Sequence, residues 1–310
     1  MNNSQLPKVS RIYQNHTLDS TRWDHYTPRA GDIIVTTSYK SGTSWMQDIV
    51  LHLIYQGQEI PNLMDVSPWV DARFMMSIEE LKQILAQENR RCLKAHIPLD
   101  GLPYYPQVKY IVVGRDARDV FMSWWNHYSN YTADAYDALN NIPGRVGPPI
   151  PRCPQDIRDY WRTWISKGWF EWESEGYPHS GNMHHTQTWW NYRHLNNILF
   201  VHFNDLLENV ETEIARVAHF LDIAISDADI LAIAESVSLT QTRERVIKAG
   251  GDLMREIWKG GANTFYYKGT NGRWKDILTA ADLELYDKAV ARVLSPDCAQ
   301  WLEKGRSALI

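Results

Sequence analysis

The stretch IIVTTSYKSGTSWMQDIVLHLIY, residues 33–55, decides the fold of this chain. Its first five residues are apolar or β-branched, which is typical of a strand buried in a parallel sheet. The turn SYKSGTS then supplies hydroxyls, a lysine and a glycine, and the apolar positions from Trp45 to Ile54 follow a helical period that ends near Gln56. We therefore predict a strand, a turn and a helix whose N-terminal N–H groups, together with Lys40, bind a sulfate or phosphate.

Composition points to a globular protein whose charge is balanced. The chain has 310 residues, with 32 basic and 37 acidic side chains and a formal net charge of −5. A general nucleic-acid binder concentrates Lys and Arg on one face, so this balance argues against that class and requires any polyanion site to be local. Three cysteines without a CxxC pair, and the absence of a long apolar run, lead us to expect a reduced, cytoplasmic protein with no disulfide, no metal and no membrane segment.

Strand and helix patterns alternate along most of the chain. Ser77 and Glu80 are placed as a capping box, Asn204 or Asp205 can cap a later helix, and Thr279 can cap the last one. Further strands are predicted at 92–97, 109–114 and about 198–203, and helices at 77–87, 115–128, 157–165, 204–221 and from about 280. The alternation predicts one α/β domain, residues 1–310, with a central parallel sheet flanked by helices.

Two segments interrupt this alternation. A Trp- and Pro-rich insertion runs from about 130 to 183, and the aromatic pattern of its helix at 157–165 is explained either by core packing or by a binding pocket under a lid. Residues 241–275 are rich in glycine, and their Lys and Arg outnumber their acidic residues. This second segment is either a mobile, positively charged cover or an ordinary solvated loop.

The anion-binding turn does not have the order of a nucleotide kinase loop. A Walker A loop reads GxxxxGK[ST], whereas here Lys40 precedes Gly42 and no glycine opens the loop. The order YKSGTSW, residues 39–45, instead resembles the loop YPKSGTTW of the cytosolic-type sulfotransferases, with Tyr39 in place of the proline. We expect a bacterial member of that family; the alternatives are an ATP-dependent small-molecule kinase and a non-catalytic nucleotide-sensing module.

Three further segments resemble the same family, and they follow in its usual order. LKAHIP (93–98) is similar to KTHLP, VVGRDARDVFMSWW (112–125) to RNPKDVAVSYY, and YKGTNGRWKDILT (267–279) to RKGxxGDWKNxFT. The resemblance implies a P-loop-like sulfotransferase fold that needs no metal. It also implies the donor 3′-phosphoadenosine 5′-phosphosulfate (PAPS), whose sulfuryl group passes to a hydroxyl or an amine of a small-molecule acceptor.

The resemblance carries the family's roles onto the matching residues of this chain. His96 is the predicted general base, Lys40 covers the bridging and leaving oxygens, and Lys94 adds charge beside the transferring group. Trp69 and Phe74 are predicted to bind an acceptor that is either flat and apolar, such as a phenol, alcohol or steroid, or a sugar that stacks on aromatic rings. The predicted donor-binding residues are Lys40, Ser41, Gly42, Thr43, Ser44, Trp45, Arg115, Ser123, Phe203, Lys268 and Gly269.

Three positions depart from the family pattern. Phe203 replaces a tyrosine that contacts adenine and Leu239 replaces a phenylalanine, so we expect a looser purine pocket. The family's dimerising segment is not recognisable, which leaves the oligomeric state open. Tyr267 replaces an arginine that binds the 3′-phosphate, a role that three other cations could take over: Arg255, Lys259 and Arg273.

Overall fold

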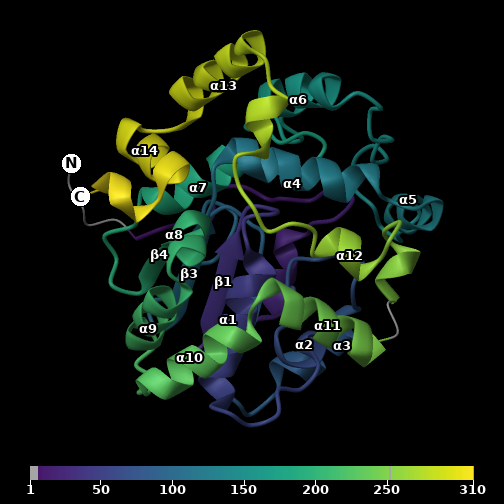
Figure 1. Ribbon diagram of the computed structural model, residues 1–310. Helices are drawn as coiled ribbons and strands as arrows, with labels where there is room; N and C mark the ends of the chain where they lie inside the picture. The colour runs from purple at the N-terminus through teal and green to yellow at the C-terminus, as the bar shows by residue number, and fades with distance from the viewer. Residues whose placement is uncertain (1–5, 251–252, 310) are drawn as a thin grey trace.

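A computed structural model describes residues 6–250 and 253–309, and its centre is a parallel sheet (Figure 1). The sheet has four strands in the order β2-β1-β3-β4 among these residues. In its register, Thr36 of β1 lies opposite Ala95 of β2 and Val112 of β3. All four strands run in the same direction, so their carboxyl ends share one edge of the sheet, and the predicted central parallel sheet is confirmed. The strands are β1 Ile33–Thr37, β2 Cys92–Ala95, β3 Lys109–Gly114 and β4 Ile198–His202.

Helices cover both faces of this sheet. In the view of Figure 1, α4, α6, α13 and α14 lie in the upper part of the molecule, and α9, α10 and α11 in the lower part. Short 3-10 helices span 20–25, 253–256, 273–276 and 306–309. The α-helices of the described residues are α1 Thr43–Tyr55, α2 Leu63–Val66, α3 Ile78–Leu85, α4 Ala117–Ser129, α5 Ala133–Asn140, α6 Ile157–Ser166, α7 Asn182–Trp190, α8 Phe203–Glu208, α9 Val210–Phe220, α10 Asp227–Ser236, α11 Leu239–Gly250, α12 Ala262–Phe265, α13 Ala280–Val293 and α14 Pro296–Lys304.

Strand β1 supplies both layers of the core because successive side chains of a strand point to opposite faces. Ile33 and Val35 pack in one layer with apolar residues of α1, α9 and α10. Ile34 packs in the other layer with side chains of the N-terminal segment, among them Trp23. All five residues of β1 are buried, which is why the strand reads as a continuous apolar run.

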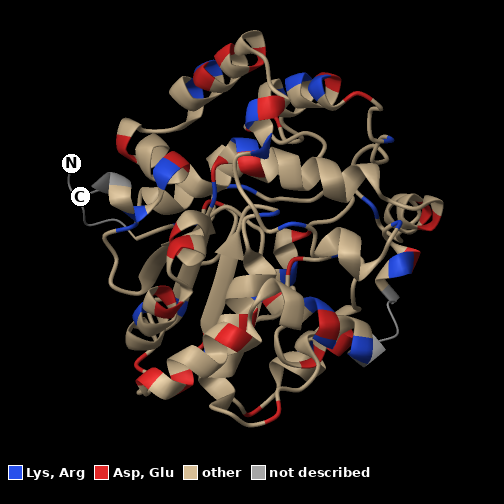
Figure 2. Cartoon of the chain, viewed as in Figure 1, with Lys and Arg blue, Asp and Glu red and all other residues tan. Residues whose placement is uncertain are grey.

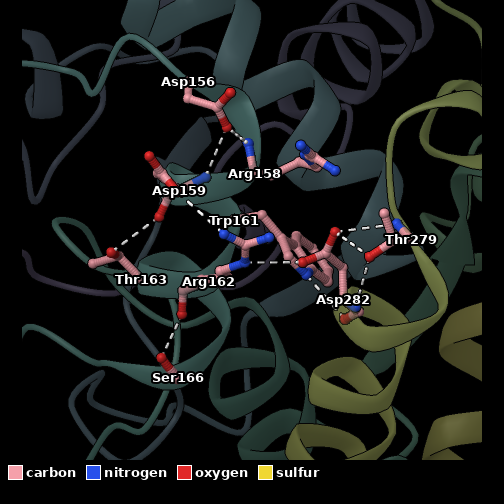
Figure 3. A network of polar contacts seen from close by, with 9 residues as sticks. All are labelled: Asp156, Arg158, Asp159, Trp161, Arg162, Thr163, Ser166, Thr279 and Asp282. Carbon is pink, nitrogen blue, oxygen red and sulfur yellow. Dashed lines mark hydrogen bonds and ion pairs between the residues drawn. The ribbon is translucent and has the colours of Figure 1, made fainter.

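The predicted Trp-rich insertion contributes a core of its own. Its helix α6 buries Tyr160, Trp161, Trp164 and Ile165 against α4 and α13, so the core-packing interpretation holds for this helix. Figure 3 shows the polar contacts that tie α6 to α13. Trp161 Nε1 donates to the carbonyl oxygen of Asp282 (3.0 Å), and Arg162 Nε donates to its carboxylate (3.2 Å).

Helix ends follow the predicted capping signals with one exception. Capping boxes form at Ser77 with Glu80 and at Thr279 with Asp282, as predicted. The prediction of one helix over 204–221, capped by Asn204 or Asp205, is wrong. Asn209 has extended backbone angles and its side chain accepts the N–H of Thr212 (2.8 Å), so it ends α8 and caps α9, while His202 caps α8.

The Gly-rich basic segment is largely ordered into short elements. Its first part lies in helix α11, residues 251–252 are outside the described residues, and α12 and a 3-10 helix follow.

Figure 2 shows charges of both signs interspersed over the helices in this view. No helix within 6–250 and 253–309 has both the length and the apolar character that a bilayer crossing requires.

Candidate active site

The turn between β1 and α1 has the backbone features of an anion-binding loop. Lys40 and Gly42 have positive φ angles of 64° and 105°, and Gly42 is the N-cap of α1 without any side chain that caps the helix. The first N–H groups of α1 therefore have no side-chain cap. A Cβ atom at Gly42 would lie 2.9 Å from the ring of Phe203, so only glycine fits this tight loop.

His96 lies at the edge where the parallel strands end. The register that pairs Thr36 with Ala95 brings the next residues, Thr37 and His96, side by side. His96 Nδ1 lies 2.7 Å from the Thr37 carbonyl oxygen, which can only accept a hydrogen bond. Nδ1 therefore carries the proton in the neutral ring, and Nε2 keeps a lone pair, as a general base requires.

A buried carboxylate holds His96 and Trp69 together. Asp71 Oδ2 accepts the backbone N–H of His96 (3.0 Å) and the indole N–H of Trp69 (2.7 Å), and Oδ1 accepts the indole N–H of Trp23 (3.2 Å). Burial raises the pKa of Asp71 to about 6, although these hydrogen bonds act to lower the pKa. The Trp69 ring lies 4.8 Å from the His96 ring, and the Phe74 ring lies 5.6 Å from the Trp69 ring, so Trp69 is beside the predicted base and Phe74 is next to Trp69.

Two lysines act electrostatically on His96. Lys94 Nζ lies 4.3 Å from the centre of the Trp69 ring, and burial lowers the pKa of Lys94 to about 8. Lys40 Nζ donates to Nδ1 of His127 (3.3 Å), and burial, with the charges of Arg115 and Lys94, lowers the pKa of Lys40 to about 7. Burial and the charge of Lys94 hold the pKa of His96 well below its usual value. The ring is therefore neutral at pH 7, and the charges of Lys94 and Lys40 both contribute to lowering its pKa.

Arg115 is buried at the end of β3 and holds several parts of the site together. Its guanidinium lies 4.0 Å from the centre of the Phe203 ring, and Nη1 donates to the Lys40 carbonyl oxygen (3.0 Å). Asn271 and Thr270 of the Gly-rich segment accept its other hydrogen bonds. The last part of the Gly-rich segment therefore contacts Arg115. Ser123 lies on α4, partly buried, two turns after its start.

The other residues predicted to bind the sulfuryl donor lie in or beside the same turn. Ser41 Oγ lies 2.7 Å from Ser38 Oγ, and Thr43 Oγ1 lies 2.6 Å from Thr37 Oγ1, so these hydroxyls also fix the loop. Ser44 is in the first turn of α1. Trp45 meets Phe203 edge-on at 5.6 Å, and its Nε1 is buried without a hydrogen-bond partner in the part of the chain that the structure describes.

The cations near Tyr267 are arranged around its ring. Lys268 is exposed and its Nζ lies 5.2 Å from the ring centre, and the guanidinium of Arg273 lies 5.4 Å from the same centre. Burial lowers the pKa of Arg115 to about 10, opposed by Asp119 and assisted by the charge of Arg273. The charge of Arg273 therefore acts on Arg115, and the substitution for the family's arginine stays a prediction. Gly269 has a φ of 63° and lies against Leu239.

Sequence reasoning missed several residues of this site. The Tyr39 ring lies 4.4 Å from that of His96 and is also in contact with Trp69 and Trp124; its only signal was the departure from the family's proline. Asp71 and His127 gave no motif at all. The adjacent His184 and His185 diverge to different partners, and no group of three or more potential metal-ligating side chains was found within the described ranges.

Comparisons with known proteins point to one family. The model of the sulfotransferase domain family matches residues 30–301. A glycolipid sulfotransferase of Mycobacterium tuberculosis is 30% identical over 319 residues, covering 98% of each chain. Sulfotransferase 1A1 of Rattus norvegicus is 27% identical over 286 residues, covering 88% of each chain.

Solved structures share the fold at lower identity. A mouse sulfotransferase complexed with PAP superposes with a TM-score of 0.69 at 16% identity, covering 96% of this chain and 98% of that one. A retinol dehydratase in complex with androsterone and inactive cofactor PAP gives 0.65 at 19% identity, covering 89% and 84%. These comparisons and the four motifs support neither of the alternatives, a kinase or a nucleotide sensor. The chain belongs to the sulfotransferase family and is a sulfotransferase enzyme.

Proposed function

We propose that this sulfotransferase transfers the sulfuryl group of PAPS to a hydroxyl or an amine of a small-molecule acceptor, with His96 as the general base. The observation that carries the proposal is the hydrogen bond from His96 Nδ1 to the Thr37 carbonyl oxygen, which leaves Nε2 as the basic nitrogen. The two PAP complexes among the structural relatives support the choice of donor.

The residues at the turn fit such a donor. The donor carries about four negative charges, and the cations Lys40, Arg115 and Arg273 gather where strands β1 and β3 end. The uncapped N-terminus of α1, with Thr43 and Ser44, would hold the 5′-phosphate, and Arg115 with Ser123 the 3′-phosphate. Trp45 and Phe203 offer aromatic surface for the adenine.

The protein's part in the chemistry is positioning, proton removal and charge stabilisation. When bound, the donor supplies an activated sulfuryl group. His96 Nε2 would take the proton of the acceptor hydroxyl as the oxygen attacks. Lys40 would stabilise the negative charge that develops on the leaving phosphate, and Lys94 would place charge beside the transferring group.

Calorimetric titration with 3′-phosphoadenosine 5′-phosphate (PAP), beside ATP and ADP, tests the donor. We expect micromolar or tighter binding of PAP, weak binding of ATP, and loss of PAP binding in Arg115→Ala. Arg118→Ala is the matched control, because Arg118 follows on α4 but pairs with Asp116. Equal or tighter binding of ATP would overturn the proposal.

The base is tested by turnover. His96→Ala should lower kcat by roughly 10²–10⁴-fold, the usual contribution of a positioned general base, while PAP still binds. A His96→Ala enzyme with wild-type kcat would remove His96 from this role.

A further inference from the structure

Two buried histidines near the site have no hydrogen-bond partner. His16 is 0% exposed and His179 is 2% exposed, and all four of their ring nitrogens are without a partner among the described residues. Their rings meet edge-on, with 4.9 Å between centres, in a geometry that does not pair the nitrogens with each other. Since a neutral imidazole always has one N–H donor and one acceptor nitrogen, two donors and two acceptors are left over.

Buried polar groups of a protein normally have hydrogen-bond partners, and other buried histidines of this chain do have them. His202 is equally buried, but its Nε2 lies 2.9 Å from the Leu302 carbonyl oxygen and its Nδ1 accepts the N–H of Asn204 (3.1 Å). The unpaired nitrogens of His16 and His179 therefore need an explanation, and a ligand that supplies the missing partners is one.

The pair adjoins the predicted acceptor region through one ring. The centre of the Tyr39 ring lies 4.4 Å from that of His96 and 5.5 Å from that of His179. Trp124 meets His179 at 4.2 Å, and Trp169 meets His16 at 4.8 Å, so the walls are aromatic. A small cavity of about 10 Å³, lined by Tyr39, Trp124 and His179 among others, adjoins His179 and has room for roughly one oxygen-sized group.

This chemistry selects one kind of ligand. Burial lowers the pKa of both histidines, that of His16 to about 3, so the pair is neutral and does not attract an anion. A metal site would need further ligands, and no suitable group of three was found in the described part of the chain. A hydroxyl both donates and accepts, so it can use the N–H of one ring and the lone pair of another, and the C–H faces of a sugar ring pack on aromatic walls.

We propose that His16 and His179 form a second acceptor subsite, which binds a hydroxyl remote from the reacting one, so that the preferred acceptor carries several hydroxyls, as a sugar does. This inference rests on the proposed function, because it assumes that the acceptor reacts at His96. The Tyr39 ring, which contacts both His96 and His179, links the two places.

The test compares hexyl glucoside with 1-hexanol, which share the alkyl chain and differ in the sugar. The wild type should prefer the glucoside in kcat/KM. His16→Phe and His179→Phe keep a planar ring and remove the nitrogens, and each should lower the ratio of the two kcat/KM values by roughly tenfold, about the value of one lost hydrogen bond, mainly through KM.

Stability separates a binding role from a structural one. Both variants remove unpaired buried nitrogens, so their Tm should rise, whereas His202→Phe removes two made hydrogen bonds and should lower Tm. An unchanged ratio in both variants, a wild-type preference for 1-hexanol, or a fall in Tm like that of His202→Phe would each overturn the subsite.

Binding can also be measured without turnover. Hexyl glucoside is titrated onto the free protein and onto the PAP-saturated protein. Its Kd should be roughly tenfold higher for His179→Phe than for the wild type. No saturable binding to the wild type would overturn the subsite, whereas a protein that binds the glucoside but not PAP would refute the proposed donor alone.

Discussion

The side-chain oxygen of Asn271 accepts two hydrogen bonds from Arg115, from Nε at 2.9 Å and from Nη2 at 2.7 Å. The carbonyl oxygen of Thr270 accepts a third from Nη2 (3.1 Å). The N–H groups of Arg115 that are predicted to bind the 3′-phosphate therefore donate to Thr270 and Asn271 of the Gly-rich segment. A 3′-phosphate that binds Arg115 must compete with these two residues.

Asn271→Ala should tighten PAP binding severalfold. The variant removes the side-chain oxygen that accepts hydrogen bonds from Arg115 and that a phosphate would have to displace. Because the state in which Arg115 is free to bind phosphate is then more populated, the apparent affinity for PAP rises. Calorimetry with PAP measures the change, and Asn263→Ala, an exposed residue of the neighbouring α12, is the control. A weaker affinity would show that Asn271 supports the phosphate site and does not compete with it.

The pH dependence of kcat/KM should report the protonation state of Lys40. Its pKa of about 7 in the free enzyme means that the ammonium is lost as pH rises through 7, so kcat/KM for the donor should fall above that pH. Bound phosphate would raise the pKa of Lys40, so the alkaline limb of kcat should lie at higher pH. Burial and the charge of Lys94 hold the pKa of His96 well below 6.5, so the acid limb should lie below that of an ordinary histidine.

Lys40→Arg is the sharp control for this assignment, because a guanidinium does not deprotonate in this range. The alkaline limb of kcat/KM should then move toward the pKa of Lys94, about 8. An alkaline limb that stays near pH 7 in Lys40→Arg would assign it to another group.

Asp71→Asn should lower kcat by roughly 10- to 100-fold without weakening PAP binding. Both carboxylate oxygens accept N–H groups, so the amide nitrogen of asparagine must face at least one donor. We expect a loss of stability of about 1–3 kcal/mol from the unpaired donors. Because Trp23 supplies one of those donors, Trp23→Phe combined with Asp71→Asn should cost less than the sum of the two changes. Strict additivity would argue against the shared hydrogen bond.

Gly42→Ala should weaken PAP binding about tenfold or more, because its Cβ would press on Phe203 and displace the turn. Gly57 gives a matched control, since it also has a positive φ, 81°, but a Cβ atom there would meet no other atom within 4 Å. Gly57→Ala should cost about 1–2 kcal/mol of stability from backbone strain, with PAP affinity intact. Equal PAP affinities for both variants would contradict the steric argument.

Much of the fold could be predicted because its signals are local. The burial of both faces of β1 produces a continuous apolar run, and the capping boxes at Ser77 and Thr279 involve residues only three positions apart. The break at Asn209 was missed because the apolar period continues through it, and the competing side-chain hydrogen bond that ends the helix leaves no trace in that period.

The sequence by itself determined the strand, turn and helix of the anion site, the parallel α/β architecture and the order of motifs that identifies the family. Only the tertiary structure decided which side chains meet. Arg115 and Asn271 are 156 positions apart, and His96 and Thr37 are 59 positions apart. Likewise, His16 and His179 meet beside Tyr39 without any motif to announce it. Local periodicity and capping are encoded within a few residues, whereas these contacts depend on the sheet order and on packing between segments that are distant in the chain.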